Sequence, residues 1–181
     1  MDQLRRWRRA RWLGYYRDMR GRAAALVLAG MLVAAAPPAP RAVVVFAQGS
    51  WAALKFGPRC EAAARPLPPA SRRQSEARAG FAFGVPGRLG EFHVRLSRVP
   101  RAGSSVMLTF GEQPFMLVAR GDRAWSRGPL QEAAIIAAAR AARSMRIEAR
   151  DGAGRRFADR YLLDGAPTAI DAAAAACAGK T

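Results

Sequence analysis

The stretch SMRIEARDGAGRRFADRYLL, residues 144–163, decides the fold class of this chain. Its first part alternates apolar and charged residues from Met145 to Arg150, and its last part directs Phe157 and Tyr161 to one side. Alternation with a period of two is typical of a strand that buries one face. The intervening DGAG is a strong turn signal. The stretch therefore predicts an antiparallel hairpin.

Similar patterns continue on the N-terminal side of this hairpin. In EFHVRLSR, residues 91–98, the side chains of Phe92, Val94 and Leu96 are expected on one face and those of His93 and Arg95 on the other. A Gly-Glu-Gln connection between two apolar segments predicts a second hairpin. The remaining predicted strands are 43–46, 51–56, 79–84, 106–110 and 114–120.

Two helices are predicted on either side of the 144–163 hairpin. The segment 129–143 opens with proline and ends with arginines, as the helix dipole favours, and spacing places Leu130 and Ile135 on one face. The Ala-rich segment 166–178 is expected to begin at a capping box of Thr168 and Asp171. The fold class expected is α+β, mainly antiparallel β, as a sandwich-like or strongly bent sheet with two flanking helices.

The N-terminal part has the features of an export signal. A basic segment precedes fourteen apolar residues, Ala23 to Ala36, and a Pro-rich exit. Such a helix would be about 21 Å long, short of the ~30 Å hydrocarbon core. We therefore interpret residues 1–42 as a signal peptide and 43–181 as a single domain. Met19 is an alternative start, Ala42 and Ala47 are alternative cleavage sites, and a signal-anchored membrane protein is the alternative topology.

The formal charge of the chain is +17, of which the first 42 residues carry +7 and the remainder +10. A basic domain attracts anionic partners such as phospholipid or lipopolysaccharide. The arginines are scattered rather than clustered, and no basic stripe is interleaved with aromatic residues, so a nucleic-acid partner is not expected. The residues predicted to form an anion-binding surface are Arg95, Arg146 and Arg150, on the solvated faces of their strands; the competing interpretation is that they only solubilise the sheet.

The chain contains two cysteines, Cys60 and Cys177. In an exported protein an even number of cysteines favours a bridge, and two allow a single pairing. A zinc site needs about four ligands, and His93 is the one histidine, so no metal or cofactor is expected. The alternation around His93 favours an ordinary strand position over a catalytic base.

The order of these features resembles a known family. GSWAALKFGPRC at the start of the domain and YLLDGAPTAIDAAAAACA at its end resemble the invasion-associated locus B family, and HVRLSRVPRAGSSVMLTFGEQPFMLV looks like that family's central strand pair. The resemblance covers roughly residues 44–178. It implies a protein exported by a Gram-negative bacterium, in which Cys60 and Cys177 correspond to the family's outer cysteines.

These observations predict a non-enzymatic periplasmic or secreted protein, a binding or structural module of the cell envelope. Its partner is unknown, with an anionic envelope component as the candidate, and membrane contact is expected only through the signal segment. The alternative is a periplasmic hydrolase that uses carboxylates such as Glu91 and Glu112, which requires two acids to converge in a pocket.

Overall fold

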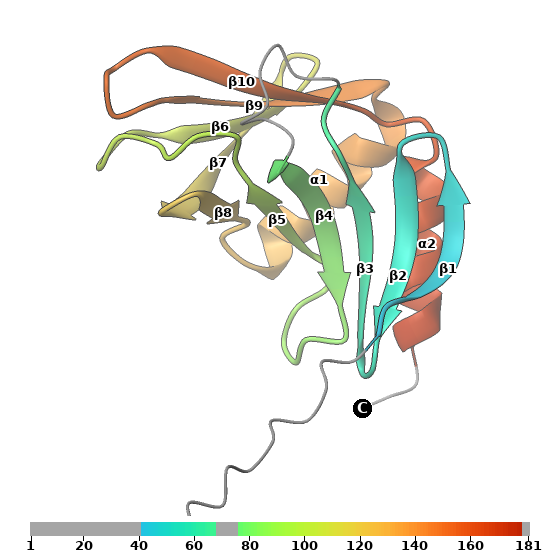
Figure 1. Cartoon of the computed structure of the whole chain (residues 1–181). Coiled ribbons are helices and arrows are strands. Elements are labelled where there is room, and N and C mark those ends of the chain that lie inside the picture. Colours follow the sequence, from blue (N-terminus) through green and yellow to red (C-terminus); the bar gives the residue numbers. More distant parts are fainter. Residues whose placement is uncertain (1–40, 68–75, 179–181) are drawn as a thin grey trace, which may run out of the picture. The chain divides into compact units, whose positions relative to one another are not determined.

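The computed structural model describes residues 41–67 and 76–178, and within them ten strands form one sheet (Figure 1). All neighbours pair antiparallel, in the order β1-β2-β3-β4-β5-β8-β7-β6-β9-β10. The strands are β1 Val43–Gln48, β2 Trp51–Phe56, β3 Arg59–Ala64, β4 Arg78–Phe83, β5 Glu91–Arg95, β6 Val106–Phe110, β7 Gln113–Arg120, β8 Arg123–Trp125, β9 Ser144–Arg150 and β10 Arg156–Leu162. Both predicted hairpins, β6–β7 and β9–β10, are confirmed, whereas β3 and β8 were not among the predicted strands.

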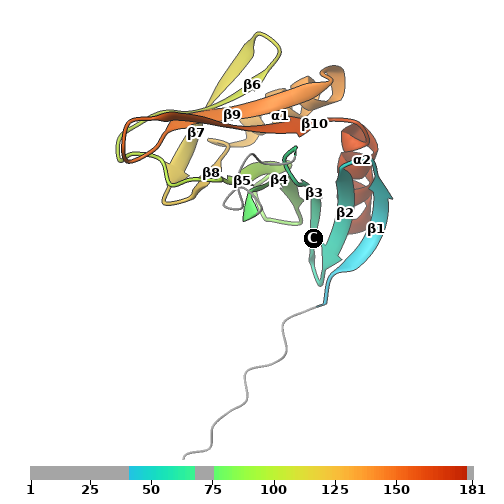
Figure 2. The ribbon, with the colours of Figure 1, turned by 45° about the horizontal axis from the view of Figure 1, so that its top comes forward.

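The sheet is strongly bent, so that its last strand returns toward its first ones. In Figures 1 and 2, β9 and β10 cross one end of the sheet while β1 to β4 run away from them. The backbone NH of Leu67, just after β3, donates to the carbonyl of Arg160 at 2.8 Å. The indole Nε1 of Trp51 donates to the carbonyl of Leu162, also at 2.8 Å. The predicted α+β class, mainly antiparallel with two helices, is confirmed.

Helix α1, Pro129–Ala141, packs against β5 and β7. Its buried face consists of Glu132, Ile135, Ala138 and Ala139. Leu130 is 91% exposed whereas Ile135 is buried, so the prediction that they share one face is wrong. At about 100° per residue, Leu130 lies roughly 140° around the helix from Ile135, which places it on the solvent side.

The buried carboxylate of Glu132 ties α1 to the loop between β4 and β5. Its Oε2 accepts from the backbone NH of Leu89 at 2.9 Å, and its Oε1 lies 2.9 Å from Arg88 Nη1. Burying a charge is tolerated only when it is paired, because desolvation is costly. Arg88 also pairs with Glu91, so this loop is held at the start of β5.

Helix α2, Ala166–Cys177, covers β2 and β3 on their core side (Figure 2). It begins after Gly165, whose carbonyl accepts the first helical hydrogen bond from Ala169. The predicted cap at Thr168 is therefore wrong, because Thr168 lies inside the first turn. Asp171 instead pairs with Arg140 of α1.

The single disulfide joins β3 to the end of α2. Cys60 and Cys177 are bonded across 117 residues, with their Cα atoms 5.9 Å apart. Gly84 follows β4 at this point, and a Cβ there would lie 2.4 Å from the carbonyl oxygen of Pro58 and 3.3 Å from Cys177 Sγ. The absence of a side chain at Gly84 therefore lets the bridge pack against the β3–β4 end of the sheet.

The core lies on the helix side of the sheet. Trp51, Phe81 and Phe92 form a continuous aromatic group from β2 to β5, with ring centroids 5.9 and 5.3 Å apart. Small residues of β3 and α2 allow helix and sheet to approach closely. The remaining large core side chains come from β5, β6, α1, β9, β10 and α2, namely Val94, Val106, Leu108, Ile135, Met145, Ile147, Tyr161 and Ile170.

A polar group is buried within this core at β10. Asp159 is 2% exposed, and its Oδ2 accepts from the backbone NH of Ser97 at 2.9 Å. Its Oδ1 and the hydroxyls of Ser97 and Tyr161 have no hydrogen-bond partner among the described residues. Burial raises the pKa of Asp159, although the backbone hydrogen bond from Ser97 and the charge of Arg98 oppose the shift. Burial also raises the pKa of Tyr161.

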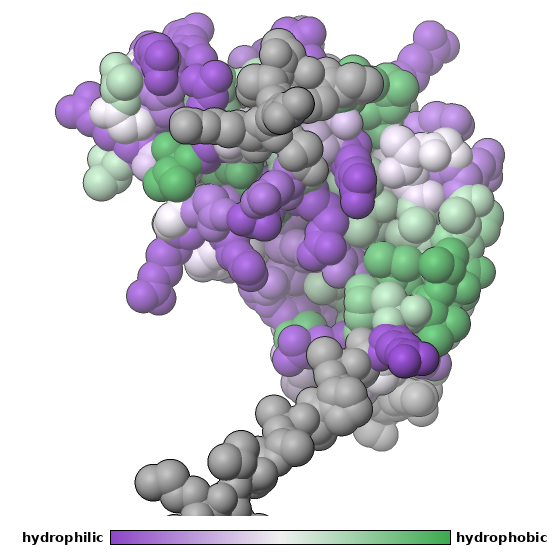
Figure 3. Space-filling model, viewed as in Figure 1, coloured by the Kyte–Doolittle hydropathy of each residue, from purple (hydrophilic) through white to green (hydrophobic). Residues whose placement is uncertain are grey.

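Strand β1 forms one edge of the sheet and is apolar on its surface. Val43, Val44 and Val45 are 60, 62 and 45% exposed. Figure 3 shows the resulting hydrophobic patch over β1 and β2, beside a hydrophilic face over β3 to β5. That hydrophilic face, turned away from the core, carries the candidate site.

Candidate functional site

Four arginines face one another across four neighbouring strands. The pairing register sets Arg78 of β4 opposite Arg95 of β5, Arg95 opposite Arg123 of β8, and Arg123 opposite Arg120 of β7. We call these four residues the arginine row. Directly opposed side chains lie about 5 Å apart at Cβ, and like charges in such positions destabilise a sheet.

Acidic residues compensate one half of the arginine row. Arg95 pairs with Glu76 at 2.8 Å and with Asp122 at 2.9 Å, and the hydrogen bond that Arg95 donates to Asp122 is the main reason that the pKa of Arg95 is raised. Arg78 Nε lies 3.7 Å from Glu61 Oε1.

The other half of the row has no such compensation. Arg120 and Arg123 are exposed and form no ion pair with an acid within the described ranges. The positive charge of the row is therefore concentrated at the β8–β7 end.

Beside the row, a glycine allows two polar side chains to meet across β4. Gly80 is paired with His93 of β5, and a Cβ at Gly80 would lie 2.9 Å from Glu61 Oε1 and 3.1 Å from His93 Nε2. Glu61 reaches over this bare backbone, so that its Oε1 lies 3.4 Å from His93 Nε2. This buried oxygen accepts no hydrogen bond from the part of the chain that the structure describes.

His93 is held neutral by its surroundings. Burial lowers its pKa from the ordinary 6.5, the charges of Glu61 and Glu91 oppose this, and those of Arg78 and Arg123 add to it. The net direction is downward. At neutral pH the imidazole that faces Glu61 is therefore uncharged.

These residues line an open depression of about 1020 Å³ on the polar face of the sheet. Its middle contains His93 and Trp125, which are direct neighbours in the register, and Trp125 is partly exposed. The arginine row borders it on one side through Arg78, Arg95 and Arg123, and Glu61 and Glu91 lie on the other. The size is at the upper end of small-ligand sites.

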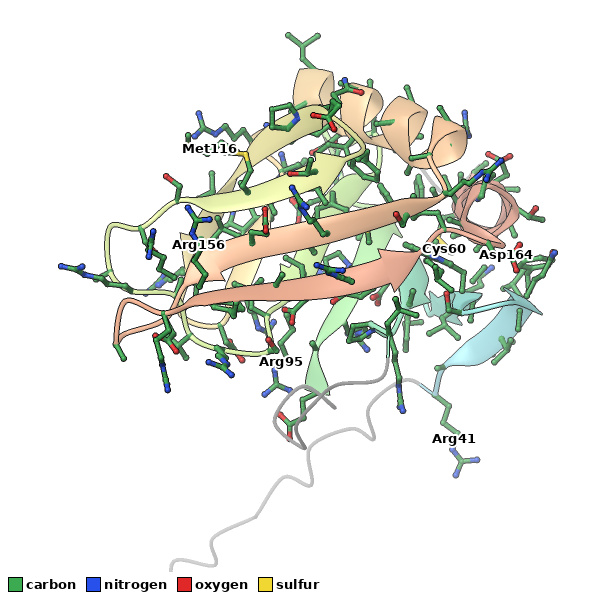
Figure 4. The ribbon with its side chains drawn as sticks, turned by 90° about the horizontal axis from the view of Figure 1, so that it is seen from above. Arg41, Cys60, Arg95, Met116, Arg156 and Asp164 are labelled. Carbon is green, nitrogen blue, oxygen red and sulfur yellow. A yellow bond between two sulfur atoms is a disulfide. The ribbon has the colours of Figure 1, made fainter. Side chains whose placement is uncertain are left out.

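The three predicted anion-binding residues fall into two groups. Arg95 belongs to the arginine row, whereas Arg146 and Arg150 project from β9, four strands further along the sheet. On β9 they are matched by β10, because Arg146 is opposite Arg160 and Arg150 is opposite Arg156. Figure 4 shows Arg95 at the lower edge of the view and Arg156 on the β9–β10 hairpin.

The β9–β10 hairpin is stabilised by polar contacts of its own. Arg146 pairs with Glu148 at 3.1 Å, and Arg150 donates to the carbonyl of Gly154 at 3.0 Å. In the turn, Asp151 accepts from the backbone NH groups of Ala153 and Arg155. Burial opposes ionisation of Asp151, but the hydrogen bonds from Arg155 and Arg98 lower its pKa overall.

The carboxylates suggested for a hydrolase are not brought together. Glu91 begins β5 and pairs with Arg88, whereas Glu112 lies in the turn between β6 and β7 and does not line the depression. The described residues contain no cluster of three or more His, Cys, Asp or Glu side chains suited to a metal ion.

Sequence reasoning missed Trp125, Arg120, Arg123 and the role of Glu61. A signal for the first three was present, because Gly121-Asp122 is a two-residue connection of the kind that joins hairpin strands. No local signal could have placed Glu61 against His93, since that contact depends on the order of β3, β4 and β5.

In the part of the chain that the structure describes, no helix is both long and apolar enough to cross a membrane. The apolar stretch Ala23 to Ala36 lies outside the described residues. Comparison of the chain with models of known families, with curated proteins and with solved structures finds no match.

Proposed function

We propose that this chain is an exported, non-enzymatic binding protein of the cell envelope, periplasmic or secreted, that holds an anionic envelope component on the polar face of its sheet. The observation that carries the proposal is the arginine row. Its like charges oppose folding of the sheet, and the charges of Arg120 and Arg123 are not neutralised by described acids. A bound anion would supply the missing countercharge.

The disulfide supports the exported location, because such bonds persist in oxidising compartments. The resemblance to the invasion-associated locus B family agrees with export and is kept as part of the proposal. For the leader we propose cleavage after Ala42. Cleavage after Ala47 would remove all of β1 except Gln48, and with it the pairing of β1 to β2.

The absence of a catalytic role is supported by the arrangement of the acids. Each carboxylate that borders the depression lies within ion-pair distance of an arginine, as Glu61 does with Arg78 and Glu91 with Arg88. An acid–base pair must instead direct two carboxylates at one bound substrate, whereas each of these is engaged by an arginine of its own.

The test is calorimetric titration of the purified protein with short-chain polyphosphate at low and at physiological salt. A charge-assisted hydrogen bond contributes about 1.5–3 kcal/mol, so Arg120→Ala with Arg123→Ala should weaken binding at least about tenfold. Arg127→Ala with Arg143→Ala is the matched control, since it removes the same charge outside the depression.

The proposal predicts that the control double variant changes affinity less than about threefold, because distant surface charges are screened by salt. Equal losses in the two double variants would mean that net charge alone attracts the anion, and the row would then have no specific role.

A further inference from the structure

The two edges of the sheet differ in how their backbone groups are satisfied. At the β10 edge, the carbonyl of Arg160 accepts from the backbone NH of Leu67 at 2.8 Å. The carbonyl of Leu162 accepts from Trp51 Nε1, also at 2.8 Å. This strand carries the charged side chains of Arg156 and Arg160, which hinder pairing with another chain. The β10 edge is therefore protected by the protein itself.

The β1 edge has no such protection. Its sequence, VVVFAQ, contains no charged residue and no proline, and Val43, Val44 and Val45 are 60, 62 and 45% exposed. Within the described ranges, its backbone is hydrogen-bonded to β2 alone. An apolar edge strand with free NH and carbonyl groups is a template for a further strand.

The pairing of β1 with β2 determines which residues present these free backbone groups. The two-residue connection Gly49–Ser50 makes Gln48 and Trp51 a hydrogen-bonded pair, and such pairs alternate along an antiparallel ladder. The NH and carbonyl of Ala47 therefore point away from β2. A bulge beyond Ala47 adds one residue, so that Val44 has the same outward phase.

A second copy of β1 in antiparallel orientation fits these groups. When Val44 of one copy lies opposite Ala47 of the other, the two residues exchange both hydrogen bonds, and a two-fold axis creates this pair twice. Val45 then lies opposite Phe46, so the residues brought together are apolar. The net positive charge of the domain opposes self-association elsewhere, but β1 itself contains no arginine.

The two ends of β1 differ in charge, which favours the antiparallel orientation. Asp164 lies at the C-terminal end, where a Cβ on Gly49 would be 2.9 Å from Asp164 Oδ2. Arg41 precedes the N-terminal end, and neither Arg41 nor Asp164 forms an ion pair with a described residue. Figure 4 shows the two side chains near opposite ends of β1.

An antiparallel pair of β1 strands places the basic end of each copy beside Asp164 of the other. In a chain cleaved after Ala42, the new α-amino group of Val43 supplies the positive charge that Arg41 supplies in the uncleaved chain. The complementarity therefore holds for both forms of the N-terminus.

We propose that this protein forms a two-fold symmetric dimer in which the β1 strands of two copies pair antiparallel and join their sheets. The contact is small, so the dimer should be reversible and should depend on protein concentration. The inference does not rest on anion binding, because β1 does not line the depression.

The experiment is sedimentation velocity of the purified exported chain over about a hundredfold range of concentration around the micromolar level. Val44→Glu with Ala47→Glu places like charges opposite each other and should weaken dimerisation at least about tenfold. Val44→Lys with Ala47→Glu alters the same two positions but opposes a positive with a negative side chain. Its dimerisation should stay within about threefold of the wild type.

Met116→Glu with Val118→Glu is the matched control, because these apolar side chains of β7 are 43 and 41% exposed and lie far from β1 in the strand order. This control should dimerise as the wild type does. A wild-type protein that is monomeric at every concentration overturns the proposal without any variant. Equal losses in the control and in the Val44→Glu, Ala47→Glu variant would indicate general hydrophobic association. Equal losses in the two β1 variants would exclude this register, and either result overturns the proposal.

Discussion

Removal of the Cys60–Cys177 bond should destabilise the domain strongly. The bond closes 117 residues and links β3 to the last turn of α2. For a loop of that size the chain-entropy model gives ~5 kcal/mol, and native disulfides typically contribute about 2–5 kcal/mol. A loss of 5 kcal/mol would lower Tm by roughly 15–20 °C in a domain of this length.

The assay is urea unfolding, monitored by circular dichroism, of the wild type, of Cys60→Ala, of Cys177→Ala and of the double variant. Each single variant already breaks the bond, so the double variant should be no less stable than either single one. Reduction of the wild type should produce a similar loss. A free-energy loss below about 1 kcal/mol, or additive losses in the double variant, would refute the assignment of a stabilising bridge.

Three further predictions concern buried polar groups. Glu132→Ala should cost about 3–5 kcal/mol in the free energy of unfolding, because Arg88 and the NH of Leu89 lose their buried partner; a loss under 1 kcal/mol in urea unfolding would contradict this. The pKa of His93 is lowered, so the unfolded chain binds more protons than the folded one and stability should fall as pH drops below about 6.5. The His93→Gln variant should not show that decline in stability. An unchanged pH profile of the variant would show that His93 is not the source of the decline. The pKa of Asp159 is raised, so the folded state binds more protons than the unfolded one and stability should fall as pH rises above about 3.8. In the Asp159→Asn variant, Tm from thermal unfolding should depend less on pH in that range. A stronger dependence of Tm on pH in the variant would argue against a destabilising buried carboxylate at this position.

Much of the fold could be predicted from local patterns. Alternation identified β5, β9 and β10, and the turn signals identified both hairpins, because each depends on neighbouring residues. Strand β3 was missed because its sequence, RCEAAA, is rich in alanine, which favours helices. Its strand conformation depends on pairing with β2 and β4 on both sides.

The candidate site could be predicted only in part. Arg95 was correctly placed on a solvated strand face, but the arginine row spans β4, β5, β8 and β7, which come together through the strand order. The four arginines therefore lie side by side in the fold, although they are scattered between positions 78 and 123 of the sequence. The buried face of α1 was mispredicted for a related reason. That face includes Glu132, whose buried charge is paired with Arg88, a residue far away in the sequence.

The most direct test of the central claim, an exported and disulfide-closed domain, is the intact mass of the protein purified from a periplasmic fraction. The mass should be measured after alkylation, with and without prior reduction. We predict a chain that begins at Val43, with two cysteines that are alkylated only after reduction. A full-length chain with two free thiols would contradict the account.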